Sequence, residues 1–254
     1  PLYSSAASDV YKRQDREGAD PRPLVAVSVA PQAFVIDRLA GSRVRVEIMV
    51  PPGASPVTYE PTIRQLRALE EARLYVAVGH PAFPFESAWL EPLLASRPEL
   101  PVIETAEPED ATADEDPHVW VTPEEIDHLA VRLAPALAAL LPDAGPDIAA
   151  NLAALRADVA RVDARLRERL AHARGRRFLV LHPAWGHLAR AYGLEQVAIE
   201  RGHKSPDAHA VAELIEATRA AGARVVFVQP QFDTTAARLV AQEIGAEVVP
   251  LDPL

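Results

Sequence analysis

Short apolar runs alternate with helical patterns along most of the chain. Runs rich in Val and Leu predict six strands, at residues 24–29, 44–49, 74–78, 178–181, 225–228 and 247–251. Continuous apolar runs of this length are typical of strands that are covered on both faces, as in a parallel sheet. The pattern therefore predicts an α/β fold in which helices connect parallel strands.

One long helix interrupts this alternation. Between Pro146 and Ala173, apolar residues recur every three or four positions, with Arg and Asp between them. This spacing predicts an amphipathic helix of about 28 residues, roughly 42 Å long at ~1.5 Å per residue. Because such a helix is longer than one small lobe, we expect two parallel-sheet α/β lobes, at 23–145 and 175–254, joined by a helical spine at 146–174. The alternative is one doubly wound domain with a long surface helix.

The two ends of the chain differ from the rest. Residues 1–22 contain no apolar segment of the kind found in signal peptides, and we interpret them as a foreign or disordered leader. The chain stops three residues after the strand predicted at 247–251. A covering helix would normally follow such a strand, so the C-terminal lobe is expected to be truncated.

Composition restricts the possible chemistry. The chain has 254 residues, a net charge of −10 and no cysteine, which excludes disulfides, thiol catalysis and cysteine-ligated metals. A site for a soft metal must then use histidine and carboxylates. The acidic balance argues against nucleic acid as a partner. Seven acids lie between Glu104 and Asp116, either as a solvated loop or as a loop that gathers cations.

Polar side chains follow several of the predicted strands directly. His80, His182 and Asp252 each stand at such a position before a proline, and ligands of parallel α/β proteins bind beyond the carboxyl ends of strands. His118 instead precedes a helix start at Thr122. His118, His182 and Asp252 form a donor set that suits Zn²⁺ or Mn²⁺. Spacing alone also allows these histidines to be ordinary turn or core residues.

Five segments in a fixed order resemble the motifs of the metal-binding solute-binding proteins of ABC uptake transporters, which are zinc and manganese receptors. They are PPGASPVTYEP at 51–61, DPHVW at 116–120, HPAWG at 182–186, QPQF at 229–232 and LDPL at 251–254. The resemblance extends over about residues 23–254. It implies two α/β lobes joined by a long helix, with the metal held in the cleft between the lobes.

The resemblance also implies a function. It assigns metal ligands to His118, His182 and Asp252. His182, where manganese receptors usually have Glu, favours zinc, with Mn²⁺ as the alternative. The protein is then expected to be a monomeric receptor without enzymatic activity, which delivers a divalent ion to an ABC permease. It would be periplasmic, or extracellular and lipid-anchored.

One position departs from the family pattern. Val57 stands where the family has a histidine, and valine offers no lone pair to a cation. Water could fill the vacated ligand position, another side chain such as His80 could replace the histidine, or metal binding could be lost. His80 could equally be a turn residue bonded to backbone. Gln229, where the family often has Glu, removes one negative charge near the cleft.

Two enzyme classes are rivals to a receptor. A site with three protein ligands and a water is the pattern of catalytic zinc, so a metal-dependent hydrolase is possible, with Glu60 near the vacated position. No HExxH motif is present. A nucleotide-binding enzyme is disfavoured because the sequence lacks both GxGxxG and a P-loop.

Overall fold

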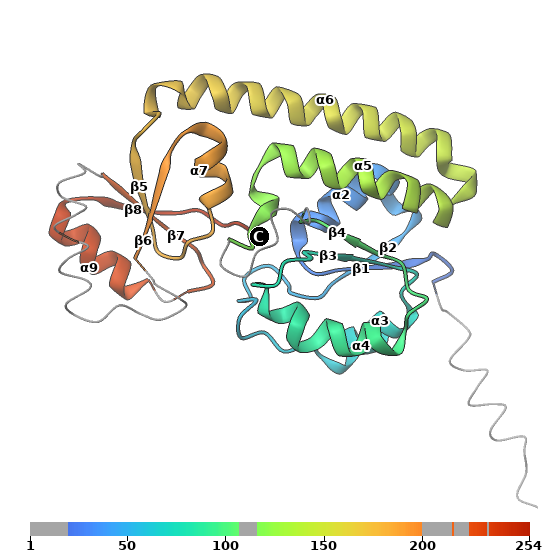
Figure 1. Ribbon diagram of the computed structural model, residues 1–254. Helices are drawn as coiled ribbons and strands as arrows, with labels where there is room; N and C mark the ends of the chain where they lie inside the picture. The colour runs from blue at the N-terminus through green and yellow to red at the C-terminus, as the bar shows by residue number, and fades with distance from the viewer. Residues whose placement is uncertain (1–19, 107–115, 200–214, 216–223, 233) are drawn as a thin grey trace, which may run out of the picture.

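The computed structural model describes residues 20–106, 116–199, 215, 224–232 and 234–254. Most of the proposed leader and most of the acidic segment after Glu104 lie outside these residues. Within them the chain forms two four-stranded parallel sheets and the helices that cover them. Figure 1 shows the sheets in two separate lobes, with one long helix running along both. The predicted two-lobed α/β fold is confirmed, whereas the lobe limits stay a prediction.

The N-terminal lobe is built on a sheet with the strand order β2-β1-β3-β4. Its strands are β1 (Leu24–Val27), β2 (Arg45–Ile48), β3 (Leu74–Ala77) and β4 (Val102–Glu104). One face packs against α2 (Ala30–Ala40), α5 (Pro123–Leu140) and the first half of α6 (Gly145–Leu170). The other face packs against α3 (Ile63–Glu71) and α4 (Glu91–Ser96). Helices on both faces explain why the central strands β1 and β3 are continuously apolar.

The C-terminal lobe repeats this strand order as β6-β5-β7-β8. Its strands are β5 (Arg177–Val180), β6 (Glu195–Ala198), β7 (Val225–Val228) and β8 (Glu247–Pro250). Helix α9 (Thr235–Ile244) packs on one face of the sheet, and α7 (Gly186–Tyr192) packs near the other. In both lobes the carboxyl ends of the strands are therefore arranged in the same order around the sheet.

The sequence pattern missed β4 and β6. Both are edge strands, so each pairs on one side only, and neither contains a fully buried residue. In addition, β4 has only three residues and ends in Glu104, and β6 begins with Glu195 and Gln196, so neither contains a long apolar run. The six predicted strands are present, each within one or two residues of its expected limits.

Helix α6 begins one residue before the predicted spine and has 26 residues. Its first half buries Ile148 and Leu155 in the core of the N-terminal lobe. Further along, Val162 is 48% exposed, because the helix has left that core. There the hydroxyl of Tyr192 on α7 donates to Asp163 Oδ1 at 3.0 Å. The helix is therefore embedded in one lobe and contacts the other along its side.

Short turns complete the described fold. They are the 3₁₀ turns η1 (Gly41–Arg43), η3 (Val119–Val121), η4 (Pro142–Ala144) and η5 (Ala171–Ala173), and the π-helical turn η2 (Glu86–Leu90). Among the described helices, none combines the length and the apolar character that crossing a membrane requires.

A buried carboxylate shapes the turn after β3. Glu86 accepts hydrogen bonds from the backbone N–H of Val78 at 2.6 Å and of Gly79 at 2.9 Å, and from the hydroxyl of Ser28. Burial raises the pKa of Glu86, and these hydrogen bonds act in the opposite direction. Because Val78 and Gly79 directly precede His80, the carboxylate fixes the backbone that leads into His80.

We predict that Glu86→Ala lowers the free energy of unfolding by about 3 kcal/mol. The substitution strands two backbone donors, and a buried unsatisfied group costs ~1–3 kcal/mol. Urea denaturation followed by circular dichroism measures the effect. Glu70→Ala, at an exposed position of α3, is the matched control and should stay within ~0.5 kcal/mol of the parent. Equal stability of the two variants would contradict the prediction.

Candidate metal centre

A small cavity lies where the two lobes meet. From the N-terminal lobe it is lined by residues that include Val57, Phe83, His118 and Trp120, and from the C-terminal lobe by residues that include His182, Gln231, Phe232 and Leu254. Its volume is about 30 Å³, which is room for one or two water molecules. A cavity of this size can hold an ion that has lost most of its water.

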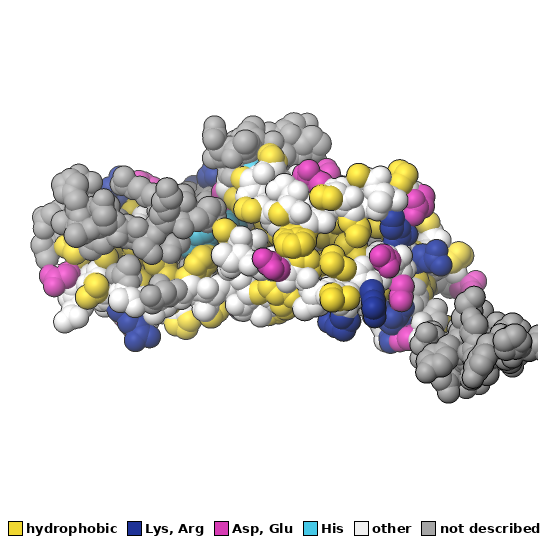
Figure 2. All heavy atoms as spheres, turned by 90° about the horizontal axis from the view of Figure 1, so that it is seen from below, with side chains coloured by type: hydrophobic (Ala, Val, Ile, Leu, Met, Phe, Trp, Pro, Cys, Tyr) yellow, Lys and Arg dark blue, Asp and Glu magenta, His cyan; other side chains and the backbone are white. Residues whose placement is uncertain are grey.

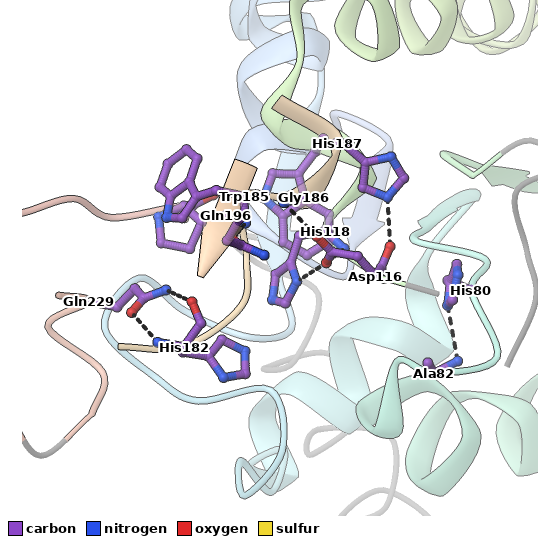
Figure 3. A network of polar contacts seen from close by, with 12 residues as sticks. His80, Ala82, Asp116, His118, His182, Trp185, Gly186, His187, Gln196 and Gln229 are labelled. Carbon is purple, nitrogen blue, oxygen red and sulfur yellow. Dashed lines mark hydrogen bonds and ion pairs between the residues drawn. The ribbon is translucent and has the colours of Figure 1, made fainter. Parts of the chain in front are cut away.

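Two of the predicted ligands meet at this cavity. The ring centroids of His118 and His182 are 5.3 Å apart, and the rings stand at 78° to each other. They are 9% and 4% exposed. His182 follows β5, whereas His118 directly precedes the turn η3. The fold thus buries imidazoles from different lobes against each other (Figure 3).

The backbone of His182 is held by one side chain. Gln229, which is 1% exposed, accepts from the N–H of His182 at 3.3 Å and donates to its carbonyl oxygen at 2.9 Å. The ring of His182 stacks on Phe232, with centroids 4.6 Å apart. A glutamate at position 229 could not donate to the carbonyl. The amide of Gln229 therefore makes two hydrogen bonds to His182, of which a carboxylate could make only the accepting one.

Asp116, which the sequence analysis included only as part of a motif, contacts both the ring and the backbone of His118. Its Oδ1 lies 2.5 Å from His118 Nδ1 and accepts from the N–H of His118 at 3.0 Å. Its Oδ2 accepts from the N–H of Gly186 in the other lobe at 2.9 Å. Burial alone would raise the pKa of Asp116, but the hydrogen bonds and charge of His118, with a smaller effect of His187, leave it below the ordinary value.

The other two candidates have hydrogen-bond partners of their own. Asp252 is exposed, and its Oδ1 accepts from Gln231 Nε2 at 2.7 Å and from the N–H of Leu254 at 3.0 Å. His80 is buried, and its Nδ1 accepts from the N–H of Ala82 at 3.1 Å, which is the turn role named above. Figure 3 shows it apart from His118 and His182. Within the described part of the chain, no three His, Asp or Glu side chains are grouped so as to hold a metal ion.

Val57 faces the same cavity as the histidine pair. It is 38% exposed and lies in the loop between β2 and α3. The position at which the resemblance expects a histidine is therefore part of the cavity wall, and in this chain that part of the wall is apolar.

This architecture defines a class of protein. Two α/β lobes, a rigid connecting helix and a small interlobe cavity with buried imidazoles are the features of a two-lobed solute-binding protein. The chain belongs to the family described as "Zinc-uptake complex component A periplasmic", whose model matches residues 25–254.

Individual relatives agree with this assignment. The chain is 25% identical to the "High-affinity zinc uptake system protein ZnuA" of Haemophilus ducreyi, over 91% of this chain and 84% of that protein. It is 24% identical to the "Zinc-binding lipoprotein AdcA" of Streptococcus pneumoniae and spans about half of its length, 54%. A solved structure, "Crystal structure of ZnuA", superposes with a TM-score of 0.83 at 37% identity and covers 92% of both chains.

A tryptophan and the end of the described chain tie the lobes together beside the cavity. Trp120 Nε1 donates to the carbonyl oxygen of Pro253 at 2.7 Å, and Leu254 packs against the N-terminal core. We predict that Trp120→Phe lowers the free energy of unfolding by about 1 kcal/mol, because this hydrogen bond is lost. Urea denaturation provides the measurement. Trp89→Phe, at a 37% exposed position, is the control, and equal losses in both variants would exclude a contribution from the Pro253 contact.

Proposed function

We propose that this protein is an extracytoplasmic receptor, periplasmic or lipid-anchored, that binds a divalent metal ion and delivers it to an ABC permease. Zinc is the preferred ion, Mn²⁺ is the alternative, and no reaction is catalysed. The observation that carries the proposal is the pair formed by His118 and His182, buried at a cavity between two lobes. The names of the zinc-binding relatives support the choice of ion.

The donor atoms favour zinc. Imidazole nitrogen is a preferred zinc ligand, whereas Mn²⁺ prefers carboxylate and water oxygens. Since Nδ1 of His118 is engaged by Asp116, its Nε2 is the nitrogen available to an ion. Asp252 is the proposed third ligand. It follows β8 and neighbours Pro253 of the cavity wall, and it would exchange its hydrogen bond with Gln231 for the ion.

Val57 leaves one coordination position without a protein donor. We propose that water occupies this position, giving a site of two histidines, one aspartate and water. Such a site is weaker than one with four protein ligands. His80 is disfavoured as the substitute because its Nδ1 already accepts from the Ala82 backbone.

A hydrolase is the weaker candidate. A general base must lie within hydrogen-bond reach of the attacking water. Glu60, the acid nearest to Val57 in sequence, is exposed and is not among the residues that line the cavity.

Calorimetric titration of the metal-free protein with Zn²⁺ tests the proposed ligands. We expect binding at a ratio of about one ion per chain. His118→Ala and His182→Ala should each weaken affinity by at least ~100-fold, since losing even an outer partner of a ligand costs ~10–100-fold. Asp252→Ala should also weaken it, by at least ~10-fold.

Two histidine variants serve as controls for this titration. His172→Ala, at an exposed position, and His80→Ala should both bind zinc as the parent does. A large loss in His80→Ala would show that His80 is a ligand. If His118→Ala binds zinc with the affinity of the parent, the proposed site is wrong.

Restoring a histidine at position 57 should strengthen binding. We predict that Val57→His binds Zn²⁺ at least ~10-fold more tightly than the parent, because it supplies a fourth protein ligand. Val131→His, at a 43% exposed position of α5, controls for an added surface imidazole. If neither the parent nor Val57→His binds Zn²⁺ or Mn²⁺, the receptor function is wrong for this chain and the loss of metal binding is the correct reading.

A further inference from the structure

We infer that Asp116 is a positioning residue whose single carboxylate orients His118 and also holds the loop that carries His182. The contact between the lobes and the alignment of the two imidazoles then depend on the same side chain. The inference deepens the proposed function and rests on it, since the relevance of the alignment comes from the bound ion. It stands on contacts that cross the interface between the lobes.

One oxygen of the carboxylate controls the ring of His118. Asp116 Oδ1 contacts both Nδ1 and the backbone N–H of His118, at 2.5 Å and 3.0 Å. A carboxylate oxygen can only accept, so His118 Nδ1 carries the proton. The lone pair of the neutral ring is then on Nε2, and the ring cannot turn without losing its partner.

The other oxygen controls the loop of His182. Asp116 Oδ2 accepts from the N–H of Gly186 at 2.9 Å, four residues after His182. The intervening loop is short and held by two further bonds, because the N–H of Ala184 donates to the His182 carbonyl at 2.9 Å and the N–H of Trp185 donates to Gln196 of β6 at 2.6 Å. Fixing Gly186 therefore restrains the whole loop.

The absence of a side chain at Gly186 allows this close contact. A Cβ added to Gly186 would lie 2.7 Å from Asp116 Oδ2, closer than the two atoms can approach. Alanine at position 186 would thus displace the carboxylate without changing its charge, and the orientation of His118 would change with it. The contact can therefore be disturbed from either side, by a substitution at Asp116 or by one at Gly186.

The next residue, His187, adds another bond across the interface. Arg190 Nη2 donates to His187 Nδ1 at 3.0 Å, since a guanidinium can only donate. Nδ1 of His187 is therefore the acceptor, and Nε2 carries the proton that it donates to the backbone carbonyl of Asp116 at 2.7 Å. The main chain and the side chain of Asp116 are both held against the start of α7 (Figure 3).

The first test uses the metal-free protein. Nitrogen-15 NMR at alkaline pH, where free imidazoles are neutral, reports which ring nitrogen of His118 carries the proton. We expect the Nδ1–H form in the parent and a mixture in Asp116→Asn and Gly186→Ala. Asp143→Asn, at an exposed position, and Gly145→Ala, where an added Cβ meets nothing within 4 Å, are the matched controls.

The second test adds metal. We expect Asp116→Asn to weaken Zn²⁺ binding by ~10–100-fold and Gly186→Ala to weaken it in the same direction. The visible absorption of bound Co²⁺ should change in both variants, which reports a change in ligand geometry that a loss of stability alone would not produce. The controls should keep the affinity and spectrum of the parent.

The outcomes separate this inference from the proposed function. If the parent binds zinc, and both variants keep its affinity, its Co²⁺ spectrum and the Nδ1–H form, Asp116 has no positioning role and only the inference fails. Lower stability with an unchanged spectrum and tautomer would likewise overturn it. If the parent binds no metal, the proposed function fails. In that case the tautomer still tests the inference: if His118 keeps the Nδ1–H form in both variants, Asp116 does not orient its ring.

Discussion

The structure depends on helix α6 to hold the two lobes at one separation. A 26-residue helix is stiff, and its first half is built into the core of the N-terminal lobe. Tyr192 and Asp163 then fix its flank to the other lobe. Because α6 restricts how far the lobes can move, the hydrogen bonds of Asp116 and Trp120 across the interface can set their detailed alignment.

Parallel sheets explain why polar residues gather at this interface. The same strand order in both lobes places loops that follow the carboxyl ends of strands at the cleft, as in other open α/β sheets. His182 and Gln229 follow β5 and β7 in this way. His118 is positioned differently, because it does not follow a strand but precedes the 3₁₀ turn that leads into α5.

Hydrogen bonds hold both histidines of the cavity in place, whereas much of the cavity wall is apolar. Asp116 holds the ring of His118, and Gln229 holds the backbone of His182. Val57 and Phe232 line the same space. A metal ion here would lose much of its water but find fewer protein donors than four. Affinity would then depend on how well the remaining donors are oriented, which gives the supporting residues more influence.

The sequence by itself determined the class of fold, the long helix and the identity of the histidine pair. Buried central strands and an amphipathic helix leave periodic patterns, and the motifs around His118 and His182 are local. Edge strands β4 and β6 leave no such pattern, because one has only three residues and the other is half polar. The tertiary structure decided which polar groups meet. It bonded Asp252 to Gln231 of the cavity wall, gave His80 a backbone partner, and joined Asp116 to Gly186 across 70 positions. Contacts of this kind depend on the relative placement of two lobes, which no local pattern of residues encodes.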